Sequence, residues 1–180
     1  NNRVVEYSVK AIDYHLNETE VMELQPVKVS HDGTMDKQGW SVETNMTSSE
    51  DVTDEHNNHG HFENPSINKV IDSDNDSVFT GTKPNNADGH VIISMDATQP
   101  IVGFRYQKPS ANAMTGYEVY VSTDKENWTL ANSGTFDTSK DEETIYFNKE
   151  GSDGGKQLWS YNASYVKIVA KGAKTVSIPE

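Results

Sequence analysis

The chain has 180 residues, of which 33% are hydrophobic and 24% charged, and its 28 acidic and 15 basic residues give a formal net charge of -13 at pH 7. Such a surface repels phosphate backbones and anionic membranes, and no apolar run approaches the roughly 18 residues that span a bilayer, so we expect neither nucleic-acid binding nor membrane insertion. The absence of cysteine excludes thiolate catalysis, disulfides and cysteine-ligated zinc.

The N-terminal region differs in character from the rest of the chain. Residues 4–12 alternate apolar and polar side chains, as a strand does, and an acidic stretch at 17–23 follows them. A turn-like sequence near residues 31–34 then marks a boundary. We therefore expect residues 1–32 to be an N-terminal extension or the end of a preceding domain, and residues 33–180 to form the main domain. The abrupt start at Asn1 suggests a piece of a longer protein.

Short β-branched and aromatic runs fill the main domain, and no sustained 3.6-residue apolar repeat appears between them. The clearest is residues 116–122, where strict alternation predicts one buried face and one wet face. Many short strands without helices predict an all-β fold, an antiparallel β-sandwich or jelly roll. The predicted strands are residues 90–95, 101–107, 116–122, 128–131, 143–148, 165–170 and 175–178.

A long polar loop at residues 45–65 contains three histidines, His56, His59 and His61. Their spacing permits a zinc or nickel site, although polar residues of a surface loop are the simpler interpretation. No Gly-x-Ser-x-Gly, His-Glu-x-x-His or phosphate-binding glycine loop is present, and no carboxylate pair stands out by motif. The sequence therefore predicts that the domain is not an enzyme.

Two stretches carry a resemblance to a known family. In residues 117–136 an alternating strand leads into an Asp/Asn turn, then Trp128, which we expect to fold over the core, and then a second strand. Residues 66–79 are similar to an Ala-x-Asp-Gly-Asp-x-x-Thr-x-Trp segment, with Ser73, Ser77 and Phe79 in place of Gly, Thr and Trp.

With further matches at residues 39–42, 101–106 and 163–168, these motifs make residues 38–180 resemble the discoidin, or coagulation factor type C, domains. Many bacterial members are classed as carbohydrate-binding modules of family 32. The resemblance implies a discoidin-like jelly roll that rides on a carbohydrate-active protein and binds sugar through loops at one end of the sandwich.

The resemblance also implies a structural calcium ion. Calcium takes six to eight oxygen ligands, and carboxylate, hydroxyl and carbonyl oxygens crowd the segment from residue 69 to residue 77. A turn rich in Asp, Asn and Ser without any metal is the alternative, because these residues favour turns by themselves. Carried over residue by residue, the calcium ligands are the carbonyls of Lys69 and Pro179 and the side chains of Asp72, Asp74, Ser77 and Glu180.

Sugar sites pair an aromatic platform with polar groups that hydrogen-bond the hydroxyls. This chain has Gln107 and Lys108 where galactose-binding relatives have an Arg, and no aromatic residue just before the C-terminal Glu. Trp159 or Tyr161 is a candidate replacement, although Trp159 is equally compatible with the core, and His90 with a purely structural role. The predicted ligand-binding residues are Asn86, His90, Lys108, Asn112, Trp159 and Tyr161.

These features predict a non-catalytic glycan-binding module, monomeric as a fragment, whose ligands contain galactose or N-acetylhexosamine. A cysteine-free module of this kind fits a bacterial protein that is secreted or displayed at the cell surface. Two other functions stay open: a protein-interaction or adhesion module that uses the same loops, and a small jelly-roll lyase.

Overall fold

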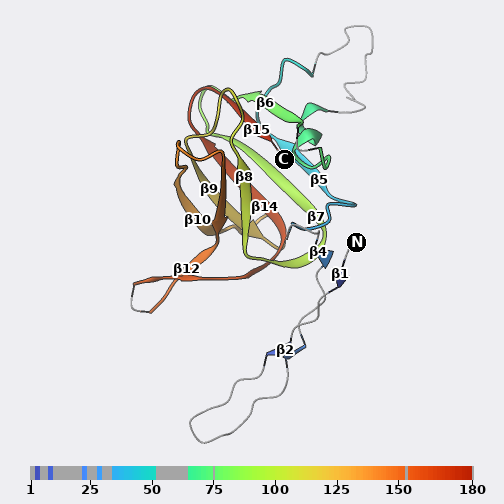
Figure 1. Ribbon diagram of the computed structural model, residues 1–180, viewed down its shortest axis with the longest axis vertical. Helices are drawn as coiled ribbons and strands as arrows, with labels where there is room; N and C mark the ends of the chain where they lie inside the picture. The colour runs from blue at the N-terminus through green and yellow to red at the C-terminus, as the bar shows by residue number, and fades with distance from the viewer. Residues whose placement is uncertain are drawn as a thin grey trace, which may run out of the picture. The chain divides into compact units, whose positions relative to one another are not determined.

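The computed structural model describes residues 34–51, 65–74, 76–152 and 154–179, together with the backbone of four two-residue strands near the N-terminus (Figure 1). Of these, β1 (Arg3–Val4) pairs with β4 (Lys28–Val29), and β2 (Ser8–Val9) pairs with β3 (Met22–Glu23), both antiparallel. The chain divides into two compact units, Asn1–Asp36 and Lys37–Glu180. Most of the predicted strand at residues 4–12, and His56, His59 and His61, lie outside the described residues.

A five-stranded antiparallel sheet forms one layer of the second unit. Its central strand, β14, pairs with β7 on one side and β9 on the other. Val91, Val119 and Ile168 lie at one level across these three strands and are buried, which places the core on this face. In spatial order the strands are β10 (Thr129–Thr135), β9 (Gly116–Ser122), β14 (Tyr161–Lys171), β7 (Gly89–Ile101) and β5 (Ser41–Thr44).

Two strand pairs make the opposing layer. β6 (Val78–Thr82) pairs with β15 (Thr175–Pro179), and β8 (Gly103–Gln107) pairs with β11 (Glu142–Tyr146). Phe79 of β6 is fully buried. An aromatic cluster joins the layers, because the ring of Phe104 on β8 meets that of Tyr117 on β9 edge-on at 5.6 Å. Tyr106 stacks on Phe136 at 4.2 Å.

Two further elements complete the domain. A short 3-10 helix, η1 (Ser66–Val70), precedes β6, and a hairpin of β12 (Asn148–Glu150) and β13 (Lys156–Leu158) follows β11. No helix in the described part of the chain is long and apolar enough to cross a membrane. The prediction of an all-β antiparallel sandwich is confirmed.

Trp128 departs from its predicted place over the core. Because Val166 and Ile168 face the core, Lys167 between them points to the outer face of the five-stranded sheet. The Lys167 ammonium lies 4.5 Å from the centre of the Trp128 ring and 5.0 Å from that of Tyr120. The indole therefore covers a cation on the outer sheet face, and the expectation that it folds over the core was wrong.

Candidate ligand-binding and metal sites

Three oxygen atoms converge where η1 leads into β6. The Ser77 hydroxyl lies 3.0 Å from the Lys69 carbonyl oxygen and 3.0 Å from a carboxylate oxygen of Asp72. One hydroxyl proton cannot serve both acceptors well. Oxygen atoms bound together at the 2.3–2.6 Å that calcium requires also lie about 3 Å from one another, so the spacing fits a shared cation.

The fold brings the end of the chain to the same place. Pro179 pairs with Val78, the residue after Ser77, so β15 delivers its last residue beside the converging oxygens. Glu180 lies outside the described residues. The described part of the chain contains no cluster of three or more His, Cys, Asp or Glu side chains that could hold a metal ion. A cation there would depend on carbonyl and hydroxyl oxygens as well as carboxylates.

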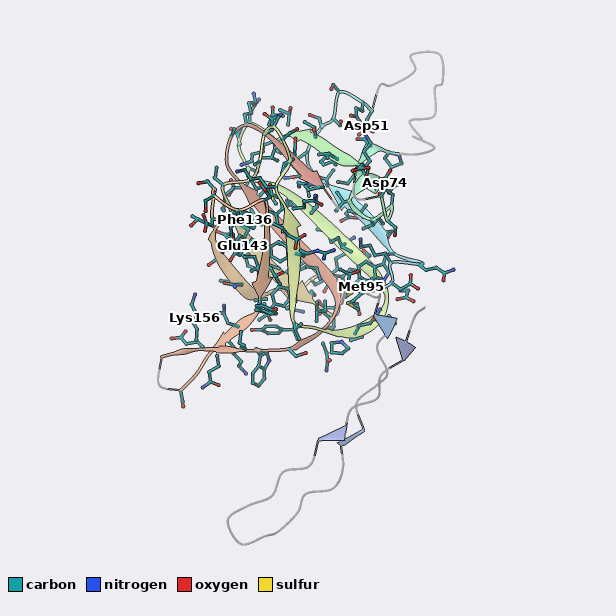
Figure 2. The ribbon with its side chains drawn as sticks, in the orientation of Figure 1. Asp51, Asp74, Met95, Phe136, Glu143 and Lys156 are labelled. Atoms are coloured by element: carbon teal, nitrogen blue, oxygen red, sulfur yellow. The ribbon has the colours of Figure 1, made fainter. Side chains whose placement is uncertain are left out.

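The loop that carries Asp72, Asp74 and Asp76, which we call the acidic loop, also uses its carboxylates to accept hydrogen bonds from its own backbone. A carboxylate oxygen of Asp72 accepts the Asp74 N–H, and one of Asp74 accepts the Asp76 N–H, each at 3.0 Å. Asp51 steadies the helix, because its two carboxylate oxygens accept the N–H and hydroxyl of Ser66. Figure 2 shows Asp51 and Asp74 at this side of the domain. Asp74 meets Ser77 through the main chain, because the Asp74 carbonyl accepts the Ser77 N–H at 3.0 Å.

Three loops form a single surface at one end of the sandwich, and we call them the rim loops: residues 83–88, 108–115 and 171–174. The Lys83 N–H donates to the Lys174 carbonyl at 2.8 Å, and the Thr115 N–H donates to the Lys171 carbonyl at 2.9 Å. Asn112 accepts the Ser177 N–H at 2.8 Å. Main-chain bonds thus hold the loops in fixed relation, as a binding surface requires.

Asn86, Lys108 and Asn112 are exposed on the rim loops. The Lys108 ammonium donates to the Thr138 carbonyl at 2.6 Å, beside a small hollow of about 70 Å³ that Lys108 helps to line. Asn112 has a φ of 54°, a left-handed conformation that Asn tolerates better than most residues. These three predicted residues therefore share one surface.

His90 lies at the edge of that surface, on β7. The main-chain N–H of His90 donates to the Asn45 side-chain oxygen at 2.9 Å, and the main-chain carbonyl of His90 accepts the Thr44 hydroxyl at 2.7 Å. Burial, and secondarily the charge of Lys167, lowers the pKa of the His90 imidazole, against a weaker effect of Glu43. The imidazole thus belongs to the outer face of the five-stranded sheet, beside Lys167 and Glu43.

Ion pairing fixes the polar corner next to His90. The Lys171 ammonium lies 2.5 Å from an Asp88 carboxylate oxygen and 3.2 Å from one of Glu118. The hydrogen bond from Lys171 lowers the pKa of Asp88, and the same bond raises the pKa of Lys171. Both groups stay charged through the neutral pH range, so this corner of the rim has fixed charges.

The structure places Trp159 and Tyr161 at the other end of the sandwich. Tyr161 pairs with Ile101, the last residue of β7, whereas the rim loop with Asn86 precedes the first residue. The pairing of β7 with β14 runs from Tyr161 to Ala170, and at about 3.3 Å per residue the ends of β7 lie roughly 30 Å apart. The predicted ligand-binding set is therefore two groups, and neither Trp159 nor Tyr161 supplies the missing aromatic platform of the rim loops, which contain no aromatic residue.

The two-layer antiparallel architecture, with polar loops gathered at one end, defines a discoidin-like β-sandwich. The F5/8 type C domain model matches residues 45–179, and the chain belongs to this family, as the sequence motifs predicted. A search of curated proteins found no match.

Solved structures share this fold at low sequence identity. One is CpGH89CBM32-5 from Clostridium perfringens in complex with GalNAc-beta-1,3-galactose: identity is 18%, the TM-score is 0.56, and the match covers 79% of this chain and 93% of that one. The family 32 module of NanJ from C. perfringens, in complex with galactose, is 13% identical, with a TM-score of 0.56 and coverage of 79% and 91%. An F5/8 type C domain from Bacteroides fragilis is 17% identical, with a TM-score of 0.58 and coverage of 81% and 91%.

Proposed function

We propose that this domain is a non-catalytic glycan-binding module that holds sugar on its rim loops. The observation that carries the proposal is the surface shared by Asn86, Lys108 and Asn112, whose loops are tied by main-chain hydrogen bonds. Amide and ammonium groups of this kind donate to and accept from sugar hydroxyls. Two similar structures are complexes with GalNAc-beta-1,3-galactose and with galactose, which supports a glycan as the ligand class.

The contacts that a sugar would make at the rim differ from those of a site built on Arg. Lys108 offers a point charge on a flexible stem where Arg would present a planar fork to two hydroxyls. Its ammonium already donates to the Thr138 carbonyl, so a sugar would share or displace that bond. We propose galactose- or N-acetylhexosamine-containing glycans, bound by hydrogen bonds with little ring stacking at the rim.

Calcium would serve this module as a structural ion. The residues that would hold it are Lys69 and Pro179 through their carbonyls and Asp72, Asp74, Ser77 and Glu180 through their side chains. The Lys69 carbonyl oxygen and an Asp72 carboxylate oxygen each lie 3.0 Å from the Ser77 hydroxyl, and this convergence supports the assignment. The ion would fasten β15 to the loop before β6 and so close a long segment of chain.

The proposed setting is a bacterial protein, secreted or held at the cell surface, whose other parts act on carbohydrate. One similar module, for example, comes from a family 31 glycoside hydrolase of C. perfringens. A module of this kind contributes by keeping its parent close to a polysaccharide, since binding through linked sites raises the effective concentration of each.

A glycan array at fixed calcium tests the proposal. Lys108→Ala and Asn112→Gly should both weaken binding, and glycine is chosen because the φ of 54° at position 112 suits it. Lys125→Ala is the matched control, because Lys125 pairs with Glu43 on the sheet face, away from the rim. Absence of any glycan bound by the unmodified domain refutes the proposal, and a partner that survives periodate treatment points instead to a protein-interaction module.

A further inference from the structure

Exposed apolar side chains gather at the end of the sandwich opposite the rim loops. In the described part of the chain, five large apolar residues are exposed, and all except Leu130 lie on segments that meet next to the buried Phe147. The Phe147 N–H donates to the Val102 carbonyl at 2.7 Å, and the Phe147 carbonyl accepts the Trp159 N–H at 3.0 Å. We call the group the hairpin platform: Val102 (57% exposed), Tyr146 (56%), Leu158 (77%) and Trp159 (44%).

The platform contains both exposed aromatic residues of the described part of the chain. Trp159 borders a hollow of about 220 Å³ on the β12–β13 hairpin, which extends away from the sandwich in Figure 1. Lys149, Ser152 and Gln157 line the same hollow. Figure 2 shows Lys156 on this hairpin, far from Asp74 and the acidic loop.

Trp159 is held beside hydrogen-bonding groups. The Lys149 ammonium lies 4.7 Å from the centre of the indole ring, and Lys149 pairs with Gln157 across the hairpin. A cation near an aromatic ring favours one orientation of the indole. Since 44% of Trp159 stays exposed, part of the ring is free to meet a ligand beside these donors.

This combination suits the two-sided chemistry of a sugar ring. The C–H face of a pyranose is apolar and stacks on an aromatic ring, while its hydroxyls accept from ammonium and amide donors. The rim loops have hydrogen-bonding groups but no aromatic residue, whereas the hollow on the hairpin has Trp159 as well as donors. The formal charge of -13 disfavours a polyanionic glycan.

We infer that the β12–β13 hairpin carries a second glycan site, where Trp159 stacks on a neutral pyranose ring and Lys149 and Gln157 donate to its hydroxyls. The inference extends the proposed function to a second place on the molecule. Because the length of β7 separates the two ends, the sites act independently and together let one domain grip a polysaccharide at two points.

Affinity electrophoresis of the whole chain in gels that contain a neutral galactan, xylan or glucan tests the site. Trp159→Ala should weaken retardation by about tenfold or more in dissociation constant, as loss of a central aromatic anchor does. Leu130→Ala is the matched control, because Leu130 is similarly exposed at 48% but lies outside the platform. Lys149→Ala should cause a smaller loss and gives a second variant with the indole intact.

The outcomes separate this inference from the proposed function. Retardation lost in Trp159→Ala but kept in Leu130→Ala supports the hairpin site. Retardation unchanged in Trp159→Ala but lost in Lys108→Ala overturns the hairpin site and keeps the rim. Absence of retardation by every glycan overturns both. Sedimentation of a dimer that Trp159→Ala converts to a monomer would show that the platform binds a second copy of the chain, and this too overturns the inference.

Discussion

If calcium binds at the Ser77 site, removing it should lower the free energy of unfolding of the domain by an amount set by the calcium concentration relative to its Kd. A ligand bound only by the folded state stabilises it by RT ln(1 + [L]/Kd), which is about 2.7 kcal/mol when calcium stands at one hundred times its Kd. For a domain of this size, each kcal/mol moves the melting temperature by about 2–4 °C. Chelation should therefore lower the melting temperature by about 5–10 °C.

Substitutions in the acidic loop distinguish a calcium site from a self-satisfied turn. Asp72→Asn keeps an oxygen that can accept the Asp74 N–H but removes a charge from the converging oxygens. If this weakens calcium tenfold, the stabilisation at the same calcium concentration falls to about 1.4 kcal/mol, half of the original gain. Asp76→Asn is the matched control, because it makes the same chemical change in the same loop outside the predicted ligand set.

Differential scanning calorimetry with EGTA and with saturating calcium measures the calcium-dependent gain for each variant. Ser77→Ala removes the shared hydroxyl and its bonds even without metal, so the gain on adding calcium is compared and not the absolute melting temperature. The original domain and Asp76→Asn should show the full gain, and Asp72→Asn and Ser77→Ala a reduced one. An equal melting temperature with and without EGTA in the original domain would refute the calcium site.

Three further predictions concern the scaffold. Tyr106→Phe removes the buried acceptor of the Met114 N–H at 2.9 Å and should cost about 1–3 kcal/mol in urea unfolding, and an unchanged midpoint contradicts it. Gly103→Ala would place a Cβ 2.2 Å from the Ile145 carbonyl oxygen, so its melting temperature should fall, and an unaltered value shows that β8 can shift freely. The Asn127 side chain and nearby N–H groups hold the pKa of Asp124 well below its usual range. That stabilisation is present above about pH 4 and is lost as the pH falls further. Asp124→Asn should therefore unfold at a lower urea concentration than the original domain at pH 6. A difference between the two urea midpoints that does not shrink by pH 3 contradicts this.

The sequence predicts well those strands whose alternate apolar side chains face the core in the structure. β9 (Gly116–Ser122) has the predicted bounds, because its alternating residues meet the core on one face and β14 and β10 along its edges. β7 extends to Ile101, beyond the predicted end at residue 95. Its pairing with β14 is irregular between Ser94 and Gln99, and Gln99 and Pro100 pair with β14 beyond that irregularity, a partner that no local pattern reveals.

The two predicted sites differ in how far along the chain their residues lie. The convergence of oxygens in the acidic loop can be predicted from the sequence because Lys69, Asp72 and Ser77 lie within nine residues of one another in the chain. The ligand-binding prediction joined residues from loops whose order in space depends on strand direction. Asn86, Lys108 and Asn112 lie on loops that the structure does bring to one surface.

Trp159 shows which rule would have separated the two ends. In an antiparallel sheet a strand carries the chain from one end of the sandwich to the other, so the residues before and after a long strand lie at opposite ends. β14 begins at Tyr161 and ends at Lys171, next to the rim loops. Residues just before it, Trp159 among them, must therefore lie far from the rim. The alternation at residues 165–170 is enough to predict that strand, and its direction assigns Trp159 to a separate surface without any knowledge of side-chain contacts.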